Sequence, residues 1–190
     1  MMKIISGSSK GAKLAMPKGI RPTQNKVRKA LFDILGDISG LSFLELFAGS
    51  GAIGFEALSK GVTELIFVEE KRDCVVAIQK NISALKAQNC QIFQKDAQEA
   101  IQLLHHKGKQ FELIFLDPPY YLELAKKTLR NLSTYDILAP NGFIIVQHFK
   151  KDDLPAQLGV LSLFKQSHYG DTSLSFYKKD VPKSNLPGKL

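Results

Sequence analysis

The stretch that decides the fold is Glu45-Leu46-Phe47-Ala48-Gly49-Ser50-Gly51-Ala52-Ile53-Gly54. Its glycines satisfy the pattern G-x-G-x-x-G, and they lie between an apolar run and a helix-compatible run. In a strand–loop–helix unit, such glycines permit a tight turn and let a ligand approach the backbone closely. The stretch therefore predicts the first strand and helix of a nucleotide-binding α/β sheet.

Short apolar runs alternate with helix-compatible stretches around this loop. The apolar runs are Ser42–Phe47, Glu64–Val68, Cys90–Phe93, Glu112–Leu116 and Gly142–Gln147, and the helical stretches are 52–60, 72–86, 97–106 and 122–133. This alternation is typical of a parallel sheet with helices on both faces. Beyond residue 150, the runs Val160–Phe164 and Ser173–Tyr177 have no long helix between them and predict a terminal antiparallel pair.

The length of 190 residues predicts about one domain. Residues 1–20 consist of short runs punctuated by glycine, which predict a small basic arm or hairpin rather than core. Residues 21–179 would form the main domain. Residues 180–190 are polar and contain Pro and Gly, so they predict a disordered tail.

Basic residues are concentrated near the N-terminus. The net charge is +8, and residues 1–30 carry eight Lys and Arg side chains but no Asp or Glu. A helix is expected after Thr23, its predicted cap, with Arg28 off the apolar face formed by Val27, Ala30, Leu31, Ile34 and Leu35. Clustered cations bind polyanions by releasing counterions, so nucleic acid is the expected partner and a merely solvated basic face is the alternative. The candidate RNA contacts are Lys10, Lys13, Arg21, Thr23 and Arg28.

The sequence argues against membrane, disulfide-bonded and metal-binding classes of protein. No apolar run approaches the roughly 20 residues that cross a bilayer, and the N-terminus lacks the pattern of a signal peptide. We therefore expect a cytoplasmic protein without a membrane partner. Cys74 and Cys90 are expected to be buried free thiols, and the scattered histidines do not support a metal site. The expected oligomeric state is a monomer.

Carboxylates lie at the expected strand ends beside the glycine loop. Glu69 closes the second strand 20 positions after Gly49, where it could accept hydrogen bonds from ribose hydroxyls. These features fit a nicotinamide dinucleotide as well as S-adenosylmethionine. Glu45 favours S-adenosylmethionine, because a carboxylate is unfavourable beside a pyrophosphate but stabilises a sulfonium or ammonium group. Asp96 ends the third strand and is interpreted as an acceptor for adenine, as the N-cap of the next helix, or as both.

The segment Asp117-Pro118-Pro119-Tyr120 follows the fourth strand and lies across the switch point from the glycine loop. The amino group of a nucleobase is a poor nucleophile, because its lone pair is delocalised into the ring. The Asp117 carboxylate and the Pro118 carbonyl could accept both N–H bonds and turn the lone pair toward a methyl donor. Tyr120 offers a ring on which the base could stack. The segment predicts methylation of a base amino group.

These segments together resemble the bacterial RNA small-subunit methyltransferase D family, which methylates guanine N2 in 16S ribosomal RNA. The resemblance covers nearly the whole chain and rests on Arg21-Pro22-Thr23 with Val27-Arg28 and Leu31-Phe32, Phe47–Gly51 with Glu56–Ser59, and Asp117–Tyr120. It implies a Rossmann-like S-adenosylmethionine-dependent methyltransferase fold with a seven-stranded, mostly parallel sheet. It also implies 16S rRNA as the partner, within a small ribosomal subunit or an assembly intermediate.

The resemblance also implies site residues. The cofactor would contact Glu45, Phe47, Gly49, Ser50, Gly51, Glu69, Asp96 and Ala97, and the chemistry would fall to Asp117, Pro118, Pro119 and Tyr120. Two positions depart from the family pattern. The arm has fewer Gly and Arg than its relatives, which leaves its RNA contacts open, and the fifth strand ends Val146-Gln147-His148 where a glutamate is common. Any role of that strand end therefore stays open.

Three alternative functions remain. A DNA adenine-N6 or cytosine-N4 methyltransferase can use the same acceptor loop, but such enzymes usually carry a sizeable recognition domain. A nucleotide-binding oxidoreductase would explain the glycines and Glu69, but it would leave Asp117–Tyr120 and the basic arm without a role. A noncatalytic RNA-binding module would bind RNA without transferring a methyl group.

Overall fold

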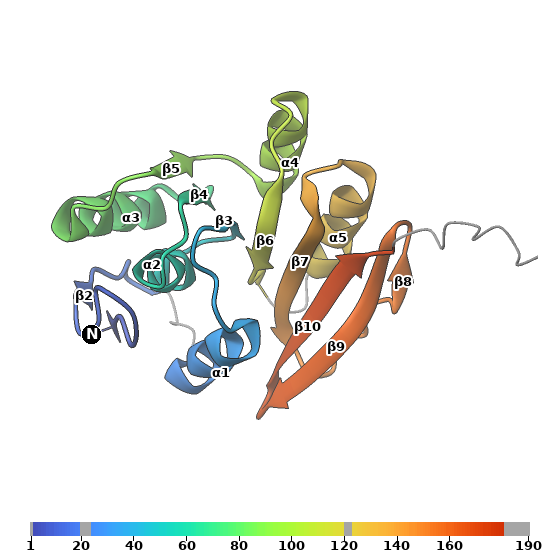
Figure 1. Cartoon of the computed structure of the whole chain (residues 1–190), viewed down its shortest axis with the longest axis horizontal. Helices are drawn as coiled ribbons and strands as arrows, with labels where there is room; N and C mark the ends of the chain where they lie inside the picture. Colours follow the sequence, from blue (N-terminus) through green and yellow to red (C-terminus); the bar gives the residue numbers. More distant parts are fainter. Residues whose placement is uncertain (1, 20–23, 120–122, 181–190) are drawn as a thin grey trace, which may run out of the picture.

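The computed structural model describes residues 2–19, 24–119 and 123–180, in which helices and strands alternate as predicted (Figure 1). The helices are α1 (Asn25–Leu35), α2 (Ala52–Ser59), α3 (Arg72–Leu85), α4 (Ala97–His106) and α5 (Leu124–Thr134). The strands are β1 (Met2–Lys3), β2 (Lys13–Leu14), β3 (Ser42–Leu46), β4 (Glu64–Val68), β5 (Cys90–Phe93), β6 (Phe111–Leu116), β7 (Leu138–Phe149), β8 (Gln157–Leu158), β9 (Leu161–Tyr169) and β10 (Thr172–Lys179).

The central sheet has the strand order β5-β4-β3-β6-β7-β10-β9-β8. Neighbours from β5 to β7 pair in parallel, and the remaining pairs are antiparallel. The chain steps outward from β3 to β4 and β5, and then returns to the other side of β3 to form β6 and β7. Ligands of open α/β sheets bind beyond the carboxyl ends of the strands at such a switch point. Here that point lies between β3 and β6.

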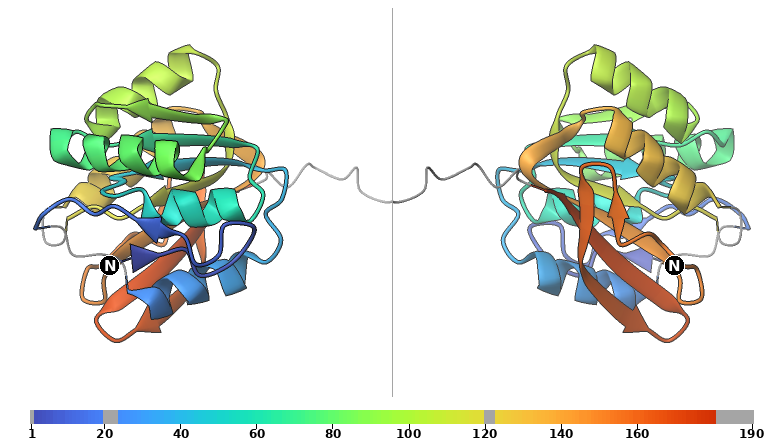
Figure 2. Two further views of the ribbon diagram at one scale, coloured as in Figure 1. Left: turned by 90° about the vertical axis from the view of Figure 1, so that its left-hand side faces the viewer. Right: turned by 90° about the vertical axis from the view of Figure 1, so that its right-hand side faces the viewer.

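Helices cover both faces of the sheet, as the side views show (Figure 2). Helices α1 to α3 pack on one face through one hydrophobic cluster, which includes Phe43 of β3 and Phe115 of β6. Helices α4 and α5 pack on the other face through a second cluster, which includes Leu44 and Ile114. Consecutive residues of a strand point to opposite faces, so parallel strands covered on both sides must be apolar throughout. This is why their hydrophobic runs are continuous.

The predicted fold class is confirmed, with one more strand than expected. The added strand is β8, whose two residues pair with β9. The predicted start of β7 at Gly142 is also wrong, because β7 begins at Leu138. Its pairing with β6 shifts between Phe111–Leu138 and Leu113–Phe143, so the residues of β7 between Leu138 and Phe143 form a bulge. The bulge contains Pro-Asn-Gly, a sequence typical of a turn, which is why the strand was predicted to begin later.

The N-terminal hairpin forms, but the expectation that it lies outside the core is wrong. Strands β1 and β2 pair antiparallel, and Met2, Ile4 and Leu14 are buried in the hydrophobic cluster beneath α1 to α3. The backbone of Ala15 exchanges two hydrogen bonds with the amide side chain of Asn81 on α3. The hairpin is therefore packed onto the domain.

The cap of helix α1 and the state of the two cysteines are two further predictions. Thr23, the predicted cap, lies outside the described residues, and Gln24 occupies the N-cap position without a side-chain cap. Both cysteines are free thiols and Cys74 is buried, as expected, whereas the prediction that Cys90 is buried is wrong, because Cys90 is only half-buried. No helix within the described ranges is both long enough and apolar enough to cross a membrane. Across the same residues, no group of three or more His, Cys, Asp or Glu side chains is arranged to hold a metal ion.

Candidate active site

A cavity of about 680 Å³ opens beyond the carboxyl ends of the parallel strands, at the switch point. Pockets for small molecules and cofactors commonly have volumes of about 300–1,000 Å³. The cavity brings together most of the predicted site residues, namely Glu45, Phe47, Gly49, Ser50, Glu69, Asp96, Ala97, Asp117, Pro118 and Pro119. Tyr120 lies outside the described residues, and Gly51 does not line the cavity.

The glycine loop between β3 and α2 is shaped by close packing. Gly51 has a φ of +74°, and a Cβ atom there would lie 2.8 Å from the ring of Phe67 and 2.9 Å from that of Phe55. A Cβ atom on Gly54 would lie 2.5 Å from Phe67 and 2.6 Å from the Glu45 carboxylate. These glycines therefore let the first turn of α2 lie directly against β3 and β4. Gly51 therefore shapes the loop by this close packing and does not line the cavity.

Glu69, at the end of β4, holds the glycine loop in place. Its carboxylate accepts hydrogen bonds from the backbone N–H of Gly49 at 2.8 Å and of Lys71 at 2.8 Å. An ionised carboxylate has about four lone-pair positions, so these two bonds leave acceptor capacity. Glu69 also lines the cavity, where a ribose hydroxyl could use that capacity.

Glu45 is a buried carboxylate in the floor of the cavity. It is 3% exposed, and its Oε2 accepts a hydrogen bond from the backbone N–H of Gly54 at 2.8 Å. Burial raises the pKa of Glu45 to about 8, and the charges of Asp117 and Glu69 add to the rise. A cationic ligand would reverse this effect, because an opposite charge favours the ionised carboxylate.

Asp96 caps helix α4. Its Oδ1 accepts a hydrogen bond from the backbone N–H of Gln98 at 2.7 Å and a longer one from Glu99 at 3.4 Å. The capping interpretation is therefore confirmed. Asp96 also lines the cavity beside the buried Ala97, so a contact with adenine stays a prediction.

Asp117 lies at the end of β6, on the opposite side of the switch point from Glu45. Its Oδ2 accepts a hydrogen bond of 2.9 Å from Nε2 of Gln147, which lies on the neighbouring strand β7. Pro118 is buried and Pro119 is exposed. The sequence leaves the role of Gln147 open, because this residue stands where a glutamate is common in the family that the chain resembles. The signal that could have identified Gln147 is its polar side chain in an otherwise buried strand. It directly follows Val146, which pairs with Leu116, the residue before Asp117.

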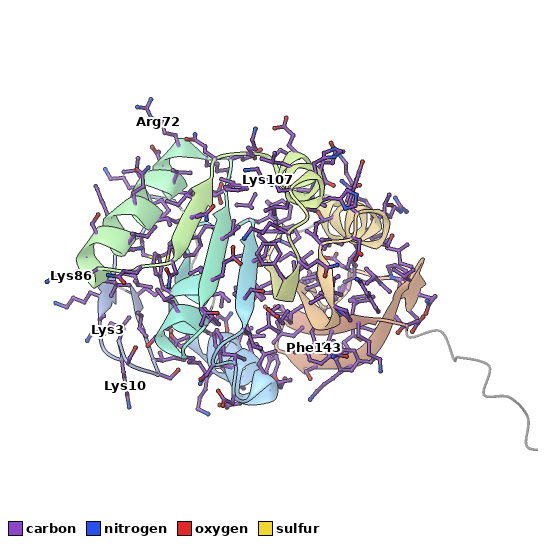
Figure 3. The ribbon with its side chains drawn as sticks, turned by 45° about the horizontal axis from the view of Figure 1, so that its top comes forward. Lys3, Lys10, Arg72, Lys86, Lys107 and Phe143 are labelled. Atoms are coloured by element: carbon purple, nitrogen blue, oxygen red, sulfur yellow. The ribbon has the colours of Figure 1, made fainter. Side chains whose placement is uncertain are left out.

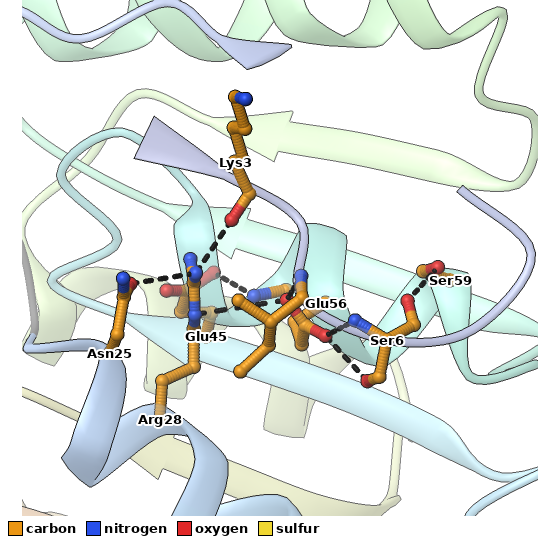
Figure 4. Close-up of polar contacts among 9 residues, drawn as sticks. Lys3, Ser6, Asn25, Arg28, Glu45, Glu56 and Ser59 are labelled. Carbon is orange, nitrogen blue, oxygen red and sulfur yellow. Dashed lines mark hydrogen bonds and ion pairs between the residues drawn. The ribbon is translucent and has the colours of Figure 1, made fainter. Parts of the chain in front are cut away.

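Arg28 does not contact RNA in the way we predicted, because the side chain is buried. It donates hydrogen bonds to the carbonyl of Lys3 at 2.6 Å and to Oδ1 of Asn25 at 3.0 Å, and it pairs with Glu56 of α2 (Figure 4). The helical pattern predicted that Arg28 lies off the apolar face of α1, and this is wrong, because Arg28 is buried together with Val27, Leu31 and Phe32. The N-terminal hairpin covers that position, which the local pattern does not reveal.

The other predicted RNA contacts are placed differently. Lys10 and Lys13 are exposed, and Figure 3 shows Lys10 extending outward from the N-terminal hairpin. Arg21 and Thr23 lie outside the described residues. Of the five predicted RNA contacts, Lys10 and Lys13 are therefore the ones that the described residues show as exposed cations.

The parallel sheet, the glycine loop at its switch point and the adjoining carboxylates define a Rossmann-like methyltransferase domain. A family model described as "Conserved hypothetical protein 95" matches residues 2–178. Ribosomal RNA small subunit methyltransferase D of Escherichia coli (strain K12) is 32% identical over 183 residues, which cover 95% of this chain and 91% of that protein. The chain belongs to the family of ribosomal RNA small subunit methyltransferase D, as its sequence motifs suggested.

Two further proteins are similar over almost their whole length. YlbH of Bacillus subtilis (strain 168), an rRNA methyltransferase by its provisional name, is 36% identical over 182 residues, which cover 94% of this chain and 99% of that protein. The solved structure of a hypothetical protein from Thermus thermophilus is 29% identical, with a TM-score of 0.83, and the match covers 94% of this chain and 99% of that one. The likeness therefore extends over the entire domain.

Proposed function

We propose that this chain is an S-adenosylmethionine-dependent methyltransferase that modifies the N2 amino group of a guanine in 16S ribosomal RNA. The observation that carries the proposal is the meeting of Asp117-Pro118-Pro119 with Glu45 and Glu69 in one cavity. The names of the relatives support ribosomal RNA as the substrate. The choice of guanine N2 rests on the family resemblance.

The residues of the cavity fit S-adenosylmethionine. The carboxylates of Glu45, Glu69 and Asp117 all line it, and such a set favours a cationic ligand over a pyrophosphate. Glu45 would lie near the positive charges of the cofactor, Glu69 would bind the ribose, and Asp96 with Ala97 would bind the adenine. Phe47, Gly49 and Ser50 would contact the cofactor along the loop. When bound, the cofactor supplies a methyl group activated by a sulfonium.

The segment after β6 would orient the target amine. Asp117 and the carbonyl of Pro118 would accept hydrogen bonds from the two N–H groups of the amine, so that the nitrogen lone pair faces the methyl carbon. After receiving the methyl group that the bound cofactor would supply, the amine would lose a proton. Because that amine is acidic, the carboxylate of Asp117 would be able to accept the proton. Tyr120 would stack on the base.

The RNA would meet the protein beside this cavity, with Lys10 and Lys13 contacting phosphates. Both lysines are exposed on the N-terminal hairpin, which packs against α2 and α3. Arg21 and Thr23 remain proposed contacts. The small ribosomal subunit or an assembly intermediate as substrate, the cytoplasmic location, the monomeric state and the absence of a metal requirement also stay predictions.

Two measurements test the proposed function. Calorimetric titration should show binding of S-adenosylmethionine, whereas binding of NADH alone would favour an oxidoreductase. Transfer of labelled methyl groups to small-subunit RNA or particles should occur with the wild-type protein. It should fall by at least about 10²-fold in the Asp117→Ala variant, because preorganised polar groups commonly contribute that much to the rate. RNA binding without transfer would indicate a noncatalytic module.

A further inference from the structure

Gln147 is placed to act together with Asp117. Leu116 of β6 pairs with Val146 of β7, so the next residues of the two strands, Asp117 and Gln147, are neighbours. The amide nitrogen Nε2 of Gln147 donates a hydrogen bond of 2.9 Å to Oδ2 of Asp117. Gln147 is 5% exposed and lines the same cavity as Asp117 and Pro118. It is therefore part of the wall that a target base would meet.

The hydrogen bond determines how the amide of Gln147 is oriented. An ionised carboxylate only accepts hydrogen bonds, so the nitrogen of the amide must face Asp117 and the oxygen Oε1 must face elsewhere. Oε1 is buried and has no hydrogen-bond partner among the residues that the structure describes. Buried polar atoms are nearly always hydrogen-bonded in folded proteins. Because the side chain of Gln147 also lines the cavity, a donor on a bound ligand is a candidate partner for this unpaired acceptor.

We propose that Gln147 determines specificity for guanine by accepting a hydrogen bond from guanine N1–H through Oε1. This inference rests on the proposed function, in which Asp117 binds the neighbouring amino group. Guanine carries the N1–H donor beside its amino group. Adenine and cytosine carry a ring-nitrogen acceptor in the corresponding position, which would face Oε1 and leave two acceptors opposed. A site built to bind a donor rejects an analogue that lacks it.

The test compares two bases at the mapped target position of semi-synthetic small-subunit RNA. Guanine and 2-aminopurine both carry the 2-amino group, but N1 of 2-aminopurine is an acceptor. The wild-type protein should prefer guanine in kcat/KM. Gln147→Met removes both the acceptor Oε1 and the donor to Asp117, so it should lower kcat/KM for both bases, and for guanine by at least about tenfold more than for 2-aminopurine. Affinity for S-adenosylmethionine should be unchanged, which also shows that the variant is folded.

An equal loss on both bases would overturn the inference, since Gln147 would then only position Asp117. A loss on neither base would overturn it as well. Gln147→Glu gives a second measurement, because it keeps an acceptor but changes the donor to Asp117. It should slow both bases and retain the preference for guanine, and a lost preference would contradict the inference. Absence of guanine-N2 methylation by the wild-type protein on unmodified RNA would instead refute the proposed function.

Discussion

Arg28 and Glu56 form an ion pair in the interior of the protein, with Nε of Arg28 3.7 Å from Oε2 of Glu56 and both side chains 0% exposed. Glu56 also accepts hydrogen bonds from the backbone N–H groups of Ile5 and Ser6, and Arg28 binds the carbonyl of Lys3. Burial lowers the pKa of Arg28, and the charge of Glu56 opposes the shift. The pair joins the N-terminal hairpin and α1 to α2, the helix that follows the glycine loop.

We predict that Arg28→Met destabilises the fold by about 3–5 kcal/mol, because it leaves the Glu56 carboxylate buried without its partner. The free energy of unfolding from urea titration measures this loss. Lys29→Met is the control, since Lys29 is exposed on the same helix and should change the stability by less than about 0.5 kcal/mol. A fully stable Arg28→Met protein with reduced RNA affinity would restore Arg28 as an RNA contact.

The paired substitution of Lys10 and Lys13 by Ala should weaken binding to RNA. Each lost phosphate contact reduces the slope of log K against log salt concentration by roughly 1, so the pair should reduce it by roughly 2. Fluorescence anisotropy over a range of salt concentrations measures the slope. A matched control replaces Lys165 and Lys178, which are exposed on β9 and β10. An equal change in both double variants would show that only total charge matters.

Cofactor binding should depend on the ionisation of Glu45. Its raised pKa of about 8 means that the free protein carries a neutral Glu45 below that pH. A cationic cofactor favours the ionised form, so binding must release a proton, and affinity should fall as the pH decreases below 8, by up to about tenfold per pH unit. Calorimetry between about pH 6 and pH 9 measures this. Glu45→Gln should bind more weakly and lack this dependence, and an unchanged pH profile in the variant would assign the effect to another group.

Gly54→Ala should destabilise the protein although alanine is the better helix former. The gain in helix propensity is about 1 kcal/mol, but the added Cβ would lie within 2.6 Å of both Phe67 and Glu45. Overpacking of a core costs about 1–3 kcal/mol and here also displaces the carboxylate that faces the cofactor. Urea unfolding and cofactor titration check both effects, with Gln102→Ala at an exposed position of α4 as the control. A stabilised variant with normal cofactor binding would show that α2 can shift without cost.

The parallel half of the sheet is predictable because strands buried on both faces, such as β4 and β6, have continuous apolar sequences. The glycine loop is predictable because its glycines stand between such a strand and a helix. The two-residue strand β8 carries no pattern of its own. The start of β7 at Leu138 is concealed by the residues that bulge out against β6.

The site was predictable where a residue ends a strand. Glu69 and Asp117 are examples, because the ends of parallel strands meet at one edge of the sheet. Arg28 was misassigned because helical periodicity describes one helix, whereas its burial depends on a hairpin paired elsewhere. The contact of Gln147 with Asp117 depends on the pairing of β6 with β7, which the sequence of neither strand specifies.

Mass mapping of the methylated nucleoside is the most direct test of the central claim. Small-subunit RNA or particles would be incubated with S-adenosylmethionine and either the wild-type protein or the Asp117→Ala variant. We predict N2-methylguanosine at a defined position with the wild-type protein, and at least about 10²-fold less with the variant. Methylation of an adenine or cytosine amino group, or an undiminished yield of N2-methylguanosine with the variant, would contradict the claim.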